Sequence, residues 1–133
     1  MIVRGLRFAP AWSRTLLRLA SAVLLAQSML AWASMLGLAD GIGAFEALEP
    51  AARNLLLLAA VLCPVAAIGA WFVSDWGPVL WWGWIVALGI ALVVGAEPSR
   101  PIALAFVVHV VLAGAWLLTA ARMERRGAED DPA

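Results

Sequence analysis

The sequence predicts an all-α membrane protein, a four-transmembrane-helix bundle of up-down-up-down topology with both termini cytoplasmic. Three observations support this prediction. Hydrophobic residues make up 65% of the 133 residues and the mean hydropathy is +0.95, whereas soluble domains have ~45–50% apolar residues with glycine included. Four long stretches carry almost no charge, and the Arg residues gather near the two ends of the chain. This composition excludes a disordered chain and argues against a soluble globule, which could not cover its core with so little polar surface.

The four apolar stretches are each long enough to cross a bilayer. They cover residues 16–38, 54–73, 79–95 and 102–121, with lengths of 23, 20, 17 and 20. A spanning helix needs ~20 apolar residues, within a range of about 17–25. The stretches lack the alternation of polar and apolar residues that β-barrel strands require. We therefore expect one membrane domain over residues 1–133, with helices at about 16–38, 52–73, 79–95 and 102–121, and a short charged cytoplasmic tail over residues 122–133.

The placement of Arg predicts the orientation. Seven of the nine basic residues fall on the side of the termini: Arg4, Arg7, Arg14, Arg18, Arg122, Arg125 and Arg126. Only Arg53 and Arg100 fall on the other side, so the positive-inside rule places both termini in the cytoplasm. The segment Ala31–Ala33 also resembles a signal-peptide cleavage site, but the apolar run continues to Leu38 and exceeds the ~7–15 residues of a signal-peptide core. A multi-pass protein of the bacterial inner membrane is the expected class.

The first helix has three distinct faces when its residues are placed 100° apart. One face is polar and small (Ser21, Gln27, Ser28 and Ser34), a second is small (Ala22, Ala26, Ala33 and Gly37), and a third is bulky (Leu25, Met29, Trp32 and Leu36). Small and polar residues mark helix–helix contacts in lipid, so we expect packing on the first two faces and exposure of the third. Gln27 is expected to form an interhelical hydrogen bond. In the second helix, Pro64 should cause a kink because it cannot donate to the carbonyl of Ala60.

Tryptophan is concentrated at one hairpin, where five of the eight Trp residues fall between positions 71 and 84. Trp71, Trp76, Trp81 and Trp82 are expected near the cytoplasmic headgroups, where an indole ring suits the membrane interface. An alternative is an aromatic face that contacts a lipid, a quinone or a helix of another subunit, and Trp32 belongs to the same class of contact residues. Trp84 lies deepest and is least explained by an interfacial belt.

The single histidine, His109, lies in the fourth helix on a face with Ala105, Ala113, Trp116 and Ala120. This face is lined by small residues, so the imidazole should point into the bundle. An ionisable residue in a membrane is a functional hypothesis by default, and His109, Trp84 and Trp116 are the candidate cofactor-binding residues. The alternative is a neutral imidazole that hydrogen-bonds across helices, to Gln27 or to the carbonyl freed by Pro64.

Other chemistry is not indicated by the sequence. One His and one Cys do not supply the ligands of a zinc site, so no metal is expected, and a haem would need a Met or a second chain as its other axial ligand. Cys63 should behave as a small buried hydrophobe. No Ser-His-Asp set, phosphate-binding loop or CxxC motif is present. We expect no catalytic residues.

The sequence resembles a family of small uncharacterised four-helix inner-membrane proteins of proteobacteria. The resemblance rests on the segment Leu58–Trp71, the pair Trp76–Gly77 with the Trp-rich start of the third helix, His109 in the fourth helix and the Arg-rich end that follows. The resemblance covers roughly residues 15–126. It implies a bacterial inner membrane and assigns no catalytic activity.

These observations favour a non-enzymatic accessory or structural subunit of a larger inner-membrane complex, respiratory or photosynthetic. The first alternative is a small lipid-, quinone- or haem-binding redox protein centred on His109, and the second is a homo-oligomeric channel or transporter. No cofactor is required by the sequence, although a lipid or quinone could bind. Expected partners are membrane lipid and other membrane subunits. Nucleic acid is not expected because the net charge is zero, and the oligomeric state is left open.

Overall fold

A computed structural model describes residues 11–38, 45–94 and 100–129 of the chain. The described part contains four α-helices and one short 3-10 helix: α1 (Ala11–Met35), η2 (Phe45–Ala47), α2 (Pro50–Trp71), α3 (Trp76–Val94) and α4 (Arg100–Glu129). All four α-helices are long and apolar enough to cross a membrane. The predicted class, an all-helical protein with four helices of membrane-spanning length, is therefore confirmed.

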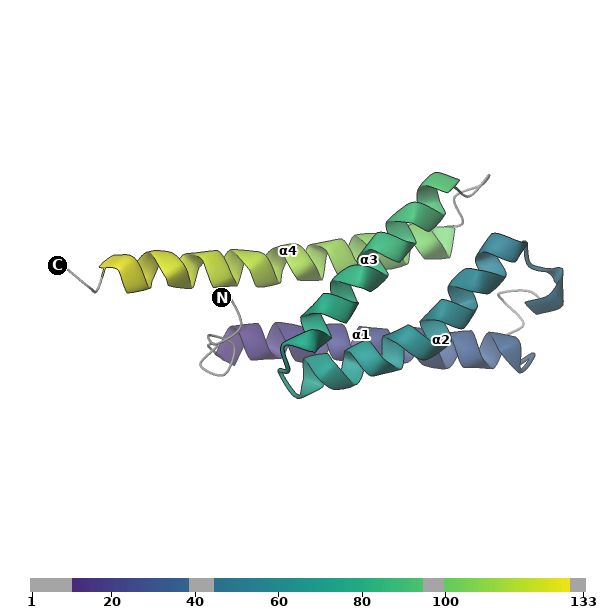
Figure 1. The fold of residues 1–133 in the computed structure, drawn as a ribbon, viewed down its shortest axis with the longest axis horizontal. Coiled ribbons are helices and arrows are strands. Elements are labelled where there is room, and N and C mark those ends of the chain that lie inside the picture. Colours follow the sequence, from purple (N-terminus) through teal and green to yellow (C-terminus); the bar gives the residue numbers. More distant parts are fainter. Residues whose placement is uncertain (1–10, 39–44, 95–99, 130–133) are drawn as a thin grey trace.

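Successive helices run in alternating directions, so the start of α1 and the end of α4 lie toward the same end of the molecule (Figure 1). Helix α1 packs against α2 and α4, and α3 also packs against α2 and α4. The contacts of α2 with α1 and α3 are much more extensive than those of α4 with its neighbours. The final part of α4 extends past the other helices (Figure 1). Helix α4 therefore packs less extensively than the other three α-helices.

The helix boundaries differ from the apolar stretches because the end of an apolar run is not the end of a helix. Helix α1 starts at Ala11, five residues before the predicted start, and ends at Met35 although the apolar run reaches Leu38. Gly37 ends this helix in a left-handed conformation, with φ of 71°. The amides of Gly37 and Leu38 donate to the carbonyls of Ser34 (3.2 Å) and Ala33 (2.8 Å). This is the glycine-dependent Schellman arrangement that closes many helices.

The predicted cytoplasmic tail is helical over most of its length. Helix α4 continues to Glu129 rather than stopping near residue 121. Seven of the eight residues from Arg122 to Glu129 are Arg, Met, Glu or Ala, which favour helix, and the segment has one glycine (Gly127) and no proline. Charge marks where the apolar span ends, but these residues allow the backbone to continue as a helix.

Helices α2 and α3 meet in a tight hairpin at residues 72–75. Val73 adopts a left-handed φ of 53°, and both the amide and the hydroxyl of Ser74 donate to the Gly69 carbonyl, at 3.0 and 2.7 Å. A Cβ atom added at Gly69 would lie 2.7 Å from the Cα of Gly77, and one added at Gly77 would collide with the Gly69 backbone. The two helices therefore cross with direct backbone contact, which only glycine at both positions allows.

The core of the bundle is built from small side chains of α2 against α1, with larger side chains of α3 beside them. The buried residues of α2 are Ala59, Ala60, Cys63, Ala66, Ala67, Gly69 and Ala70. Ser21 links the two helices by donating its hydroxyl to the carbonyl of Ala67 at 2.8 Å. Small residues allow this close approach, which increases dispersion contacts in a lipid environment where the hydrophobic effect between helices is weak.

One expectation for α1 was wrong. Ser21, Ser28 and Ser34 are buried as predicted from their shared face, and the bulky face with Leu25, Met29, Trp32 and Leu36 is exposed. However, the second small face does not pack, because Ala22, Ala26 and Gly37 are exposed and Ala33 is half-buried. Leu17, Leu24 and Ala31, spaced seven residues apart, turn inward instead. Larger side chains fill the interior better than the small face could.

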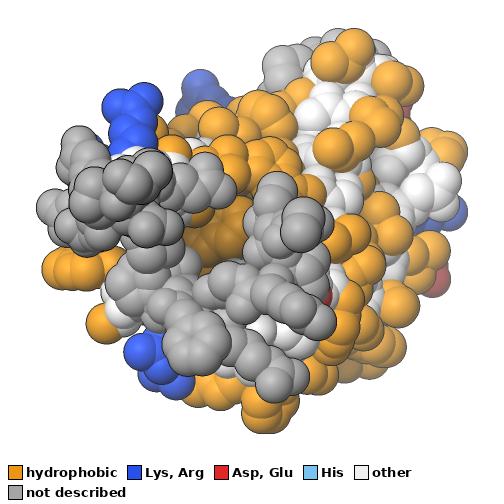
Figure 2. Space-filling view, turned by 60° about the vertical axis from the view of Figure 1, so that its left-hand side comes forward, with side chains coloured by type: hydrophobic (Ala, Val, Ile, Leu, Met, Phe, Trp, Pro, Cys, Tyr) orange, Lys and Arg blue, Asp and Glu red, His pale blue; other side chains and the backbone are white. Residues whose placement is uncertain are grey.

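Hydrophobic side chains outnumber charged ones among the coloured residues on the face that Figure 2 shows. Many large apolar residues on all four helices are half exposed or more, among them Met29, Val61, Val86, Ile90, Val107 and Leu118. A soluble monomer rarely exposes apolar surface on this scale, whereas lipid tails cover such surface at no penalty.

Candidate functional site

A polar junction lies inside the bundle where three helices meet. It consists of Gln27 from α1, Trp81 and Trp84 from α3 and His109 from α4. His109 and Trp81 are fully buried, Trp84 is almost fully buried, and Gln27 is half-buried. We call these four residues the polar junction. It brings Gln27 and His109 together, although they lie 82 residues apart in the sequence.

Three hydrogen bonds connect the polar junction. The indole N–H of Trp81 donates to His109 Nδ1 at 3.0 Å, and the indole N–H of Trp84 donates to Gln27 Oε1 at 2.9 Å. His109 Nε2 lies 2.9 Å from the same Gln27 oxygen. The Trp81 and His109 rings meet edge to face, with centroids 6.4 Å apart and planes at 68°. His109 thus connects the hydrogen bond from Trp81 to the two hydrogen bonds that meet at Gln27 Oε1.

The two tryptophans determine the protonation pattern of this network. An indole nitrogen can only donate a hydrogen bond, so Trp84 must face the oxygen rather than the amide nitrogen of Gln27. For the same reason, Trp81 requires an unprotonated Nδ1 on His109. The proton of the neutral imidazole is then on Nε2, which donates to the second acceptor site of Gln27 Oε1. Both indole N–H groups and the imidazole N–H then meet an acceptor, which determines the amide orientation of Gln27 and the tautomer of His109.

This arrangement holds His109 as a neutral, doubly bonded imidazole. A second proton on Nδ1 would point at the Trp81 N–H and replace a hydrogen bond by a contact between two donors. The only free lone pair of a neutral imidazole is the one on the unprotonated nitrogen, and Trp81 already occupies it. His109 therefore has no lone pair directed at an axial haem position or a metal ion in this conformation.

The junction lies deep in the membrane-spanning part of the bundle. At 1.5 Å per residue, Trp84 is roughly 12 Å from the start of α3 at Trp76, and Gln27 is roughly 12 Å from the end of α1 at Met35. Both distances place the polar groups well inside a hydrocarbon core ~30 Å thick. Unsatisfied polar groups are costly at this depth, which explains why both indole N–H groups and both imidazole nitrogens are hydrogen-bonded.

The structure brings together some of the predicted site residues and separates others. Gln27 and His109 are partners, as one of the two sequence interpretations expected, and Trp84 shares the oxygen of Gln27. Trp116 does not take part. It is 9% exposed, and its indole nitrogen has no hydrogen-bond partner among the described residues.

Trp81 is the clearest correction. It was expected in the interfacial belt as a contact for lipid or partners, but its side chain is fully buried against His109. Its neighbour Trp82 points outward and is 37% exposed, because consecutive residues in a helix face directions about 100° apart. The wheel position of Trp84 relative to Trp81 (i, i+3) was the signal that could have identified both as inward-facing.

The carbonyl freed by Pro64 has a partner that the sequence did not reveal. Helix α2 continues through Pro64 and bends near its middle (Figure 1). The indole N–H of Trp32 on α1 donates to the Ala60 carbonyl at 3.2 Å, four residues before Pro64. Trp32 was predicted as a contact for lipid or partners, and it is 51% exposed. Its ring therefore covers the outside of the bundle while its nitrogen compensates the missing helical hydrogen bond.

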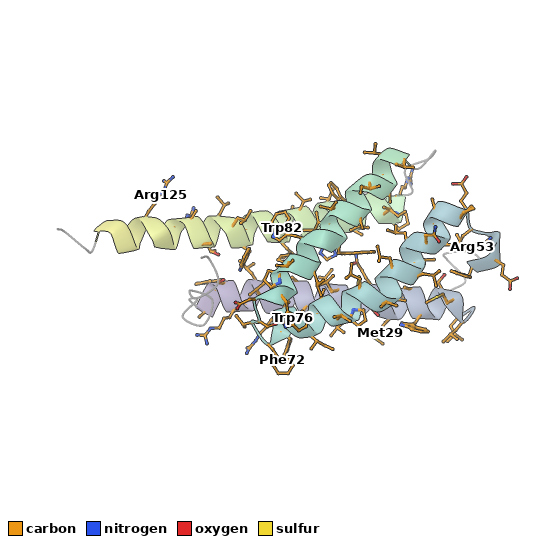
Figure 3. All side chains as sticks on the ribbon, viewed as in Figure 1. Met29, Arg53, Phe72, Trp76, Trp82 and Arg125 are labelled. Carbon is orange, nitrogen blue, oxygen red and sulfur yellow. The ribbon has the colours of Figure 1, made fainter. Side chains whose placement is uncertain are left out.

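The remaining contact candidates lie on the outside of the bundle. Trp71 is 50% exposed, Trp76 46% and Trp82 37%. Phe72, beside them at the α2–α3 turn, points away from the helices (Figure 3). The guanidinium carbon of Arg18 lies 5.4 Å from the centre of the Trp71 ring, within the range of a cation–π interaction.

A basic residue also organises the opposite end. Arg53 donates to the backbone carbonyls of Glu46 (2.7 Å) and Leu48 (3.2 Å), and its guanidinium lies 5.9 Å from the ring of Phe45. Arg53 thereby fastens η2 to the start of α2. The sequence analysis used Arg53 only as one of the two basic residues on the side opposite the termini.

In the part of the chain that the structure describes, no group of three or more His, Cys, Asp or Glu side chains could hold a metal ion. Cys63 is a free, buried thiol. Within the described part of the chain, the polar junction contains the hydrogen bonds that join one side chain to another.

These features define a class, a small multi-pass helical membrane protein with a closed polar junction between α1, α3 and α4. The comparison with protein families then identifies the chain more closely. Residues 11–127 match the model of a family of unknown function, DUF6163, and the chain belongs to this family. No curated protein and no solved structure matches the chain.

Proposed function

We propose that the protein is a non-enzymatic accessory subunit of a larger complex in a bacterial inner membrane. The observation that carries this proposal is the closed polar junction. The indole N–H groups of Trp81 and Trp84 and both imidazole nitrogens of His109 bond within the junction, to one another or to Gln27 Oε1. Such a network fixes how helices pack and leaves no reactive group presented to a substrate.

The outer surface supports the same proposal. Trp71, Trp76 and Trp82, near the α2–α3 hairpin, are between 37% and 50% exposed, and aromatic residues are enriched where proteins contact one another. Helix α4 has few buried residues and touches the rest of the bundle less than the other helices do. A loosely held helix with a large apolar face is well suited to additional packing against a neighbouring subunit.

Co-purification in a mild detergent tests the proposal. The native chain, extracted from the membranes of its own host, should recover a membrane protein at fixed stoichiometry. Replacing Trp76 and Trp82 together by leucine should weaken this association while keeping the surface apolar. A matched control is Val93→Leu, which is 86% exposed at the other end of α3 and should leave the association intact.

Three outcomes would contradict the proposal. A chain that elutes alone as a monomer would exclude a subunit role. A coloured preparation whose Soret band disappears in His109→Ala would indicate the redox alternative. A stable homo-oligomer that conducts ions in liposomes would indicate the channel alternative.

We also propose that both termini are cytoplasmic. Among the described residues, Arg14, Arg18, Arg122 and Arg125 lie toward the end of the bundle that holds the start of α1 and the end of α4. Arg53 and Arg125 lie toward opposite ends (Figure 3). Alkaline phosphatase fused after residue 133 should be inactive in a bacterial host, and a fusion between residues 39 and 44 should be active. The reverse pattern would overturn this orientation.

A further inference from the structure

A shallow apolar groove lies on the outer face of α1 and α2, near the end that holds Arg18. Its lining residues are Ser21, Leu25, Ala67, Ile68, Trp71 and Phe72. Ser21 and Ala67 form the floor, closed by the hydrogen bond between them. Because these floor residues are small and the flanking residues are bulky, the contact line between the helices is recessed. The groove is open along the lipid-facing side, where Leu25 is 42% and Ile68 is 52% exposed.

A positive charge lies beside one end of this groove. Arg18 is three residues before Ser21 on α1, and its guanidinium lies over the ring of Trp71. The contact with an uncharged ring orients the guanidinium but leaves its charge available. Asp75 is exposed in the nearby α2–α3 turn, yet the side chain of Arg18 is directed to the aromatic wall. An oriented cation therefore lies at one end of an apolar groove.

The dimensions fit one leaflet of a membrane. From Arg18 to Leu25 the helix rises roughly 10 Å, whereas one leaflet of hydrocarbon is about 15 Å deep. Arg18 is close enough to the helix start for its long side chain to reach the headgroup region. A molecule in the groove would have its polar group beside Arg18 and its apolar part directed toward Leu25 and the bilayer centre.

We propose that this groove is a binding site for an anionic phospholipid. The phosphate group binds the guanidinium of Arg18, Trp71 forms the wall next to the headgroup, and one acyl chain lies over Ser21 and Ala67. A guanidinium is particularly suited to phosphate because it offers several N–H donors in a fixed plane. The apolar walls supply contact area, and the single cation supplies preference for a negative headgroup. This inference does not depend on the proposed subunit role.

Native mass spectrometry of the full-length purified protein tests this site. The protein is exchanged into detergent with equal amounts of phosphatidylglycerol and phosphatidylcholine that carry identical acyl chains. Phosphatidylglycerol should be retained in preference to phosphatidylcholine. Arg18→Gln should weaken the apparent affinity for phosphatidylglycerol about fivefold, as expected for the loss of one basic contact with an anionic headgroup.

Two controls separate the site from general effects. Arg122→Gln removes an equal charge from α4, at the same end of the bundle, and should leave phosphatidylglycerol retention unchanged. Ile68→Trp fills the groove from its exposed wall and should reduce retention of both lipids, whereas Val86→Trp places the same side chain on α3 and should not. Far-UV circular dichroism establishes that each variant is folded.

The proposal is overturned if the two lipids are retained equally, or if Arg18→Gln and Arg122→Gln have the same effect. It is also overturned if Ile68→Trp releases a co-purified protein while phosphatidylglycerol retention stays unchanged, because the groove would then hold a helix of another subunit. A fivefold effect confined to Arg18, together with loss of retention in Ile68→Trp, supports it.

Discussion

Replacing Gln27 by leucine is the most direct perturbation of the polar junction. Leucine is similar in size and apolar, so it removes the shared acceptor with little change in volume. The indole N–H of Trp84 and the Nε2–H of His109 both lose their partner, Gln27 Oε1, at 2.9 Å each. The substitution therefore leaves two donors unsatisfied in a dry environment.

The magnitude follows from the two lost hydrogen bonds. Side-chain hydrogen bonds between membrane helices average about 0.6 kcal/mol, with a maximum near 1.7. A buried donor left without a partner costs ~1–3 kcal/mol in soluble proteins. We therefore expect Gln27→Leu to lower the free energy of unfolding by about 1–3 kcal/mol.

Reversible unfolding in mixed micelles with increasing sodium dodecyl sulfate, followed by far-UV circular dichroism, measures this change. Trp84→Phe removes one of the two donors, and the double variant completes a double-mutant cycle. Because Gln27 and Trp84 share a bond, their effects should be less than additive by roughly 0.6–1.7 kcal/mol. Leu25→Ala, on the exposed face of α1, is the control for an outward-facing substitution.

The reasoning is refuted if Gln27→Leu destabilises no more than Leu25→Ala, or if the effects of Gln27→Leu and Trp84→Phe are fully additive. Either result would mean that apolar packing, rather than the polar junction, holds α4 to α1 and α3.

Three further predictions concern the junction, the proline and the hairpin. Because His109 is the only histidine, the ¹⁵N spectrum of histidine-labelled protein should show a single imidazole protonated at Nε2, and a ring protonated at Nδ1 would disprove the proton assignment. Trp32→Phe should destabilise the protein by about 1 kcal/mol, since the Ala60 carbonyl loses its donor. The effect should shrink in the Pro64→Ala background, where a backbone N–H is restored, and an equal effect in both backgrounds would contradict this role. Gly77→Ala should destabilise by at least ~2 kcal/mol in the same unfolding assay because its Cβ meets the Gly69 backbone. Gly83→Ala, where nothing lies within 4 Å, should be neutral or slightly stabilising, and similar effects at the two glycines would argue against the close crossing.

The sequence predicted the four helices because span length and charge placement depend only on composition along the chain. It could not predict their ends equally well. Gly37 closes α1 through backbone geometry inside an apolar run, and α4 continues through a charged segment with good helix formers. A hydropathy profile along the chain detects neither the early end of α1 nor the continuation of α4.

The candidate site was predicted in part for a similar reason. Helix wheels show which residues share a face, so Gln27 and His109 could be placed inward. Trp81 was assigned to the interface with lipid because it lies near the start of α3, although its position three residues before Trp84 puts both rings on one face of the helix. The hydrogen bond between Trp32 and Ala60 depends on how α1 and α2 pack against each other. The residue patterns of the two helices, taken separately, do not reveal this packing.

The closed junction has a consequence for the order in which the helices assemble. Once α1, α2 and α3 have entered the membrane, Gln27 and Trp84 can already bond, while the N–H of Trp81 and one acceptor site on Gln27 still lack partners. The imidazole of His109 supplies both missing partners because a single ring carries both a donor and an acceptor. His109 therefore allows the last helix to be recognised by its hydrogen-bonding pattern, although most of its surface resembles lipid. A bundle formed from residues 1–99 should accept α4 as a separate peptide, and should discriminate against the same peptide carrying His109→Leu.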